Sequence, residues 1–260
     1  MLDYNYHTHT YRCGHAFGTD EEYVEAAIRA GFKVLGFSDH GPSKVYKKPG
    51  IWMDWSALDD YIESINTLKE KYKDRIKILV GLETEYFEEL HDEKTELHDR
   101  LDYLILGQHY TDPSPEGNSY FHENSDEDIL LYADNVCKAI DSGLYTYLCH
   151  PDVFMYKQKE FTESCARAAH IIARKCAMTG TPMEINIHGG SLGRHEFPAG
   201  IQYYYPHKDF WRIAAQYPVK LVIGVDAHRP EALLERDLID TVPKEIEDLG
   251  MEMIKEPFIR

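Results

Sequence analysis

Short apolar segments alternate with amphipathic stretches along the whole chain. The apolar segments have the length of strands and are rich in aliphatic and β-branched residues. They occupy residues 2–7, 34–38, 76–82, 101–107, 145–150, 183–187 and 220–224. Because most of them lack a regular alternation of polar residues, we expect parallel strands that are buried on both faces.

The stretches between these segments repeat their apolar residues every three or four positions. This spacing predicts helices over residues 19–30, 55–72, 125–142, 162–179, 207–216 and 231–249. The first helix begins with Thr19, has Glu22 three residues later as in a capping box, and ends before Gly31. Seven strands alternating with helices predict an α/β protein, either an open sheet or a closed barrel. No linker, repeat or low-complexity run interrupts this order, so we expect a single domain over residues 1–260.

The composition narrows the classes of function. The 260 residues include 28 Lys and Arg but 45 Asp and Glu, which gives a net charge of −17. Such a charge repels phosphate backbones and argues against a nucleic-acid partner. The five cysteines form no C-x-x-C pair, as in a protein with reduced thiols. No signal peptide and no run of about 20 apolar residues is present, so we expect a cytoplasmic protein without a membrane partner.

Metal-binding side chains stand at the ends of six of the seven predicted strands. Active sites of α/β barrels lie at the carboxyl ends of their strands. Imidazole and carboxylate groups bind zinc, iron and manganese. The side chains at or just after these ends, and in the loop after the first strand, are His7, His9, His15, His40, Glu83, His109, His150, Asp226 and His228.

Nine such groups exceed what one ion can hold, so the sequence predicts two or three divalent ions with Glu83 as a bridge. Ions that lie close together can hold a hydroxide between them and make it a nucleophile at neutral pH. The chain has no G-x-S-x-G motif, P-loop or G-x-G-x-x-G motif. These features predict a metal-assisted hydrolase.

The motifs resemble those of the polymerase-and-histidinol-phosphatase (PHP) superfamily. The matching segments appear in the family's order as His7-Thr8-His9, Cys13-Gly14-His15, Ser38-Asp39-His40, Gly81-Leu82-Glu83, His109, His150-Pro151 and Asp226-Ala227-His228. The resemblance implies a distorted (β/α)7 barrel and a trinuclear site of zinc, manganese or iron. It also implies three ligand sets, namely His7, His9, Glu83 and Asp226; Glu83, His109 and His150; and His15, His40 and His228.

Within the superfamily the chain is most similar to the histidinol-phosphatase branch. The similarity rests on segments 13–19, 31–40, 101–103 and 184–186, whereas Gly107-Gln108-His109 and residues 188–205 depart from the branch. It implies hydrolysis of L-histidinol phosphate in histidine biosynthesis. Three alternatives stay open: a PHP phosphoesterase acting on nucleotides or other small phosphates, an amidohydrolase, and a non-catalytic metal-binding or polymerase-accessory module. No Lys ends the fourth strand, which disfavours the amidohydrolase.

A phosphate ester also needs partners beyond the metals. Arg194, in the glycine-containing loop after the sixth strand, is the first candidate for phosphate binding, and Arg229 is the second. His188 and His195 are candidates for substrate contacts, and Asp226 or a nearby histidine such as His228 for moving the leaving-group proton. Asp39 is a candidate for orienting a ligand ring. The sequence leaves the oligomeric state open.

Overall fold

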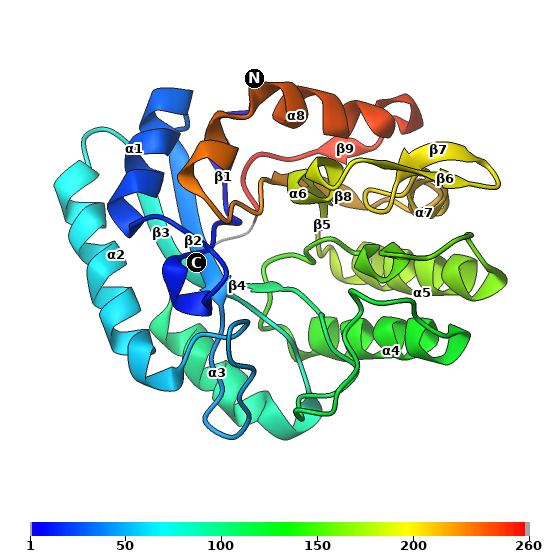
Figure 1. The fold of residues 1–260 in the computed structure, drawn as a ribbon, viewed down its shortest axis with the longest axis horizontal. Helices are drawn as coiled ribbons and strands as arrows, with labels where there is room; N and C mark the ends of the chain where they lie inside the picture. The colour runs from blue at the N-terminus through cyan, green and yellow to red at the C-terminus, as the bar shows by residue number, and fades with distance from the viewer. Residues whose placement is uncertain (1, 258–260) are drawn as a thin grey trace.

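The computed structural model describes residues 2–257, whose strands curl into a distorted barrel (Figure 1). Four parallel strands pair in the order β1 (Tyr4–Asn5), β2 (Val34–His40), β3 (Lys77–Thr84) and β4 (Tyr103–Leu106). The second group pairs β5 (Met183–Asn186), β8 (Lys220–Gly224) and β9 (Glu252–Met253), again in parallel.

Single residues join the two groups of strands. Leu148 forms parallel bridges with Leu106 at the end of β4 and with Met183 at the start of β5. On the other side, Thr8 after β1 bridges Ala227 after β8. The fifth predicted strand, residues 145–150, therefore contributes one bridging residue instead of a regular strand. The closed circuit confirms the predicted α/β barrel and shows where it is distorted.

Helices cover the outside of the barrel (Figure 1). The predicted helices are observed as α1 (Asp20–Ala30), α2 (Leu58–Tyr72), α4 (Asp126–Ser142), α5 (Glu163–Thr179) and the shorter α7 (Lys208–Ala214). Capping boxes at Thr19 and Ser125 fix the starts of α1 and α4. The prediction of one helix over 231–249 was wrong: α8 (Arg236–Thr241) is flanked by short 3-10 turns. Pro243 lies in the second of those turns, inside the predicted span, where proline lacks the N–H that a continuous helix needs.

Besides strand β9, two helices and a β-hairpin were absent from the sequence prediction. Helix α3 (His91–Arg100) is largely charged, and the short α6 (Ile187–Ser191) contains two glycines. A β-hairpin follows, in which β6 (Arg194–Phe197) pairs antiparallel with β7 (Gly200–Tyr203). Among the described residues, no helix combines the length and the apolar character that a membrane span requires.

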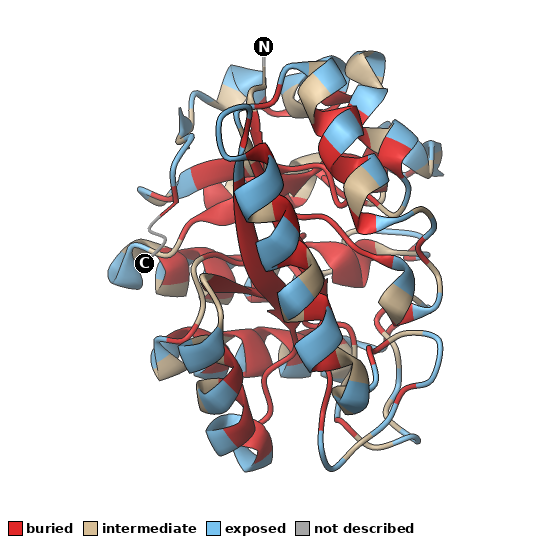
Figure 2. Cartoon of the chain, turned by 90° about the vertical axis from the view of Figure 1, so that its left-hand side faces the viewer, coloured by how far each residue is buried: buried red, intermediate tan, exposed pale blue. Residues whose placement is uncertain are grey.

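The barrel strands β2, β3 and β4 are almost wholly buried between the helices and the barrel interior (Figure 2). Tyrosines fill part of that interior together with aliphatic residues. The Tyr103 hydroxyl contacts the backbone carbonyls of Tyr6 and Phe37, at 2.8 and 2.9 Å. Gly36 and Gly81 make room for this ring, since a Cβ at either position would lie within 2.5 Å of Tyr103 atoms. The interior is thereby packed and hydrogen-bonded directly beneath the strand ends.

Candidate metal centre

The parallel register brings the predicted ligands together at the carboxyl end of the barrel. His40 pairs with Glu83 in the register of β2 and β3, so two candidates lie on adjacent strands at the same level. His150 and Asp226 have positive φ angles of 24° and 55°. This backbone region is uncommon for residues other than glycine, and such conformations concentrate at functional sites.

The first group consists of His7, His9, Glu83 and Asp226. The His9 Nε2 lies 3.0 Å from Asp226 Oδ1, and the His7 Nε2 lies 3.4 Å from the same oxygen. Glu83 Oε2 lies 3.5 and 3.6 Å from the two imidazole nitrogens. These four ligand atoms are buried, and none makes a well-aligned hydrogen bond within the described part of the chain. Sealed nitrogen and oxygen atoms that converge in this way fit a divalent cation, which would satisfy all of them.

The second group uses the other oxygen of the same glutamate. Glu83 Oε1 lies 2.9 Å from His150 Nε2 and 3.3 Å from His109 Nε2, and the two ring nitrogens are 3.3 Å apart. Glu83 therefore presents one oxygen to each group, which is the arrangement of a bridging carboxylate.

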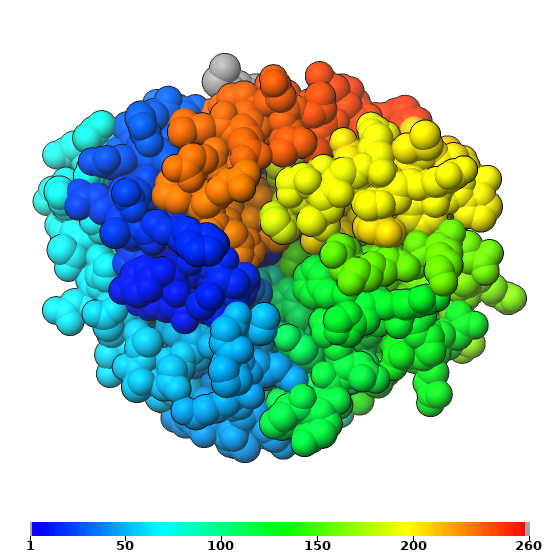
Figure 3. Space-filling view, in the orientation of Figure 1, coloured from blue at the N-terminus to red at the C-terminus, as the bar shows by residue number. Residues whose placement is uncertain are grey.

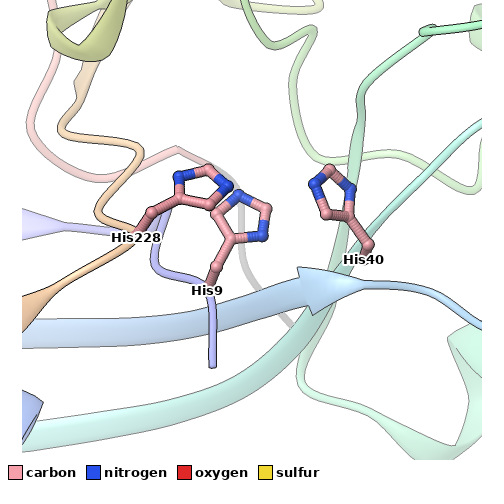
Figure 4. Close-up of side chains that lie close together, drawn as sticks. All are labelled: His9, His40 and His228. Atoms are coloured by element: carbon pink, nitrogen blue, oxygen red, sulfur yellow. The ribbon is translucent and has the colours of Figure 1, made fainter. Parts of the chain in front are cut away.

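The third group brings His15, His40 and His228 together beside His9, and three of these four rings are drawn in Figure 4. The His15 Nδ1 lies 3.0 Å from the Gly50 carbonyl, and the His228 Nδ1 lies 3.1 Å from the Asp226 carbonyl. Because a carbonyl only accepts, both Nδ1 atoms carry the proton and both Nε2 atoms carry a lone pair. Those two Nε2 atoms face each other at 3.1 Å. Two lone pairs at this distance repel, and a cation between them would turn the repulsion into coordination.

The pKa values divide the imidazoles into two classes. Burial lowers the pKa of His9, but the carboxylates of Asp226 and Asp39 outweigh it and raise the pKa to about 9. For His109, burial is likewise overcome by the charge of Glu83, which raises the pKa to about 10. By contrast, burial and the charge of His9 lower the pKa of His40 to about 4.

His15 and His228 also have lowered pKa values, chiefly through burial and then through the charge of His9. The third group therefore consists of neutral imidazoles with free lone pairs. In the metal-free protein, the positive charges of protonated His9 and His109 balance the negative charges of the carboxylates in the first two groups. Bound metal ions would take over this role.

Two carboxylates outside the ligand set hold ligand rings, and a third faces the ring of His9 without a hydrogen bond. Glu184 on β5 accepts from His7 Nδ1 at 2.8 Å and from the His150 backbone N–H at 3.1 Å. Glu85 lies 3.1 Å from His109 Nδ1. Asp39 faces His9 Nδ1 at 3.6 Å. Such contacts leave Nε2 free for a metal and fix the orientation of the ring.

The domain signature described as "PHP domain" matches residues 5–188 of the chain. The chain belongs to the PHP family. Most of the strand-end and loop candidates lie within the matched segment. Asp226 and His228 lie beyond it, yet the barrel brings both to the same centre, where Asp226 contacts His7 and His228 stacks on His9.

Relatives of this PHP protein extend over nearly its whole length. It is 29% identical over 252 residues to a Deinococcus radiodurans protein named "Probable histidinol-phosphatase", covering 94% of this chain and 92% of that protein. It is 27% identical to the "Histidinol-phosphatase" of Bacillus subtilis, covering 88% of this chain and 97% of that protein. The crystal structure of a Lactococcus lactis histidinol phosphate phosphatase with zinc, L-histidinol and phosphate matches with a TM-score of 0.73 at 19% identity, over 97% of this chain and 95% of that chain. This structural match supports the same fold.

A cavity of about 700 Å³ opens over the centre of the PHP barrel. Figure 3 shows a hollow in the surface at this place. Four segments meet there: the loop after β1 that carries His15, residues 110–122, residues 188–205 and the segment after β8. Besides metal-binding candidates, its polar lining comprises Tyr110, Asn118, Ser119, His122, His188 and Tyr205. A smaller pocket of about 160 Å³ adjoins it and shares His15, His188, Asp226 and His228.

The structure brings only part of the predicted substrate-binding set to this cavity. His188 lines both pockets, and Arg229 lines the smaller one while paired with Glu235. Arg194 lines neither pocket, because it lies on β6 and pairs with Glu245. His195, also on β6, stacks on Tyr204 with ring centroids 3.8 Å apart and is likewise outside both linings. The hairpin, which the apolar pattern of the chain did not predict, carries both side chains away.

Proposed function

We propose that this PHP protein is a metal-dependent phosphomonoesterase that hydrolyses L-histidinol phosphate to L-histidinol and phosphate. The observation that carries the proposal is the convergence of four sealed ligand atoms on His7, His9, Glu83 and Asp226, none of which makes a well-aligned hydrogen bond within the described residues. The full-length relatives named histidinol-phosphatase support the choice of substrate. In this proposal the chain is one catalytic domain acting on a small phosphate ester.

The three groups of side chains would hold zinc, manganese or iron, all of which accept imidazole and carboxylate ligands. Divalent ions bound there supply Lewis acidity and lower the pKa of water. The protein's own contribution is to fix the ligands: Glu184 and Glu85 hold the His7 and His109 rings so that each Nε2 faces the centre. The packing of Glu83 between both groups sets their separation.

The substrate would enter through the larger cavity, with the phosphoryl group toward the ligands. Asp226, or a nearby histidine such as His228, is placed to pass a proton to the departing alkoxide, since both side chains border the two pockets. His188 lines the same boundary and can contact the substrate beyond the phosphate. Arg194 has no part in this scheme because Glu245 holds it on the hairpin.

The test is phosphate release by the purified protein from L-histidinol phosphate and from a panel of nucleotides and other small phosphates. Bound zinc, manganese and iron are quantified on the same sample. We expect a preference for L-histidinol phosphate with two or three ions bound. The Glu83→Gln variant should lose ions and turnover together. Full metal loading with a different preferred substrate would contradict the proposed substrate, and turnover without any bound ion would contradict the metal-dependent reaction.

A further inference from the structure

The cavity over the metal centre has no Lys or Arg in its lining, as far as residues 2–257 are concerned. A phosphate monoester dianion usually meets such cations, or several N–H and O–H donors, in its binding site. The nine candidate ligands are committed to the ions. The donors on the wall outside the ligand set are therefore few, and most of them lie on partly exposed loop positions.

Tyr205 differs from the other donors of the cavity wall, because its side chain is buried and still borders the cavity. The residue is 1% exposed. Its ring lies edge-on to the His150 ring, with centroids 6.2 Å apart. Gly189 makes room for it, since a Cβ at that position would lie 2.4 Å from the Tyr205 ring. Packing on both sides fixes where the phenol points.

The Tyr205 hydroxyl has no protein partner within residues 2–257. Other buried tyrosines use theirs, as Tyr103 and Tyr61 do through contacts with backbone carbonyls. Unlike the sealed Tyr120 hydroxyl, that of Tyr205 belongs to a residue that lines the cavity. The Tyr205 hydroxyl is not among the sealed, unpartnered atoms, so a ligand or water in the cavity can accept its hydrogen bond.

Tyr205 borders the cavity beside the candidate ligand His150. The ordinary pKa of a tyrosine is about 10, so its phenol is protonated at neutral pH and can donate a hydrogen bond.

We propose that Tyr205 is a catalytic residue whose hydroxyl donates a hydrogen bond to a phosphoryl oxygen of the substrate. The inference rests on the proposed function for the identity of the substrate. A neutral phenol would then take the place that an arginine takes in other phosphate sites, and its fixed ring would orient the phosphoryl group against the ions.

The test compares Tyr205→Phe with Tyr204→Phe, which removes the hydroxyl of a neighbour stacked on His195 outside the cavity. Metal content is measured first and should equal that of the wild type in both variants. The dissociation constant of inorganic phosphate, obtained by calorimetry on metal-loaded protein, should rise about tenfold or more in Tyr205→Phe alone, as expected for a hydrogen bond to a charged oxygen. The dissociation constant of L-histidinol should not change. An unchanged phosphate affinity in Tyr205→Phe would overturn the proposal.

A crystal of wild-type protein soaked in phosphate provides an independent measurement that does not depend on how the variant folds. We expect the Tyr205 Oη within about 3 Å of a phosphate oxygen, and a separation without contact would overturn the proposal. The two proposals can fail separately. If the wild type binds phosphate through Tyr205 but leaves L-histidinol phosphate intact, the proposed substrate is wrong and the role of Tyr205 stands. If the wild type hydrolyses L-histidinol phosphate normally but binds phosphate without Tyr205, the role of Tyr205 is wrong and the substrate stands.

Discussion

Gly107 allows Glu83 to stand between two groups of ligands. A Cβ built at position 107 would lie 1.9 Å from Glu83 Oε1, which faces His109 and His150. Any larger residue must therefore displace the bridging carboxylate. Gly107 belongs to the segment in which the chain departs from the histidinol-phosphatase branch, and this close approach gives a physical reason for a glycine there.

We predict that Gly107→Ala loses ions of the second group and at least about tenfold in turnover, because the carboxylate moves by more than metal coordination tolerates. Metal quantification and phosphate release measure both effects. Gly143→Ala is the control: it has a positive φ of 71° but no atom within 4 Å of the added Cβ. This control should lose some stability and keep its metal. Equal metal content in the two variants would contradict the prediction.

His207 should make the stability of the protein depend on pH. It is fully buried and stacked on Phe161, and both ring nitrogens lack partners within the described residues. Burial lowers its pKa to about 4. In the unfolded chain the pKa of His207 is near its ordinary value of about 6.5. Below that pH the imidazole is therefore protonated in the unfolded state but stays neutral in the folded state. The stability that depends on this residue is complete above about pH 6.5 and falls as the pH drops toward 4.

We predict that the wild type loses about 2 kcal/mol more free energy of unfolding than His207→Phe between about pH 7 and pH 5. Phenylalanine keeps the stacking on Phe161 without a titrating group. Urea unfolding at both pH values, with both proteins loaded with the same metal, gives the difference. Parallel pH profiles for the two proteins would show that His207 does not carry the effect.

The residues of the centre differ in how far they could be predicted from the sequence. The nine metal-binding candidates could be identified because each follows a strand whose end could be located. Glu85 and Glu184 could not be identified as the groups that hold ligand rings, since a carboxylate's partner depends on which strands lie side by side. The position of Arg194 after the sixth strand predicts a phosphate contact. The sequence could not reveal that Arg194 lies on a hairpin, where it pairs with Glu245 outside the cavity lining.

Elements with strong local signals were predicted well. Helix α1 starts where its predicted capping box places it, because that cap is formed by residues three apart. Helix α4 starts one residue after the first residue of the predicted span, Ser125, which forms a capping box of its own. Helix α3 was missed since its charged sequence offers few apolar positions to define a period. The predicted length of the fifth strand, residues 145–150, was too great. Within the described chain, only Leu148 of this apolar run forms β-bridges on both sides.

The capping box at the start of helix α4 should contribute measurably to the stability of the protein. The Ser125 side chain accepts from the Asp128 backbone N–H, and Asp128 in turn accepts from the Ser125 backbone N–H. Ser125→Ala should lower the free energy of unfolding by about 1 kcal/mol, because one N–H at the helix start loses its partner. Chemical denaturation measures the change, while metal content should remain at the wild-type value. A variant as stable as the wild type would show that the cap contributes nothing here.

For the whole molecule, the barrel holds many charged and polar groups that require cations. The net charge of −17 and the buried Glu83 and Asp226 make the metal-free state electrostatically unfavourable. Without ions, burial opposes the charged carboxylates, while positive imidazoles such as His109 and His7 hold the pKa of Glu83 well below its ordinary value. Protons and metal ions therefore compete for one set of sites.

We predict that chelation lowers the melting temperature by several degrees, since a ligand that binds only the folded state stabilises it. Restoring zinc or manganese should recover the loss. The metal affinity should decrease as the pH falls from about 10, because His109 and then His9 bind protons in the metal-free protein. Thermal denaturation with and without chelator at two pH values measures both effects. The control is Glu83→Gln, whose melting temperature should respond far less to chelator. The same response in both proteins would place the stabilising ion elsewhere.

The central claim is that this centre must hold divalent ions before phosphate esters are cleaved. The most direct test adds zinc or manganese stepwise to metal-free protein and follows phosphate release from L-histidinol phosphate against bound ions per chain. We predict that turnover is absent without metal and reaches its maximum only when two or three ions are bound. Full turnover in metal-free protein, or a maximum at one ion per chain, would contradict the account.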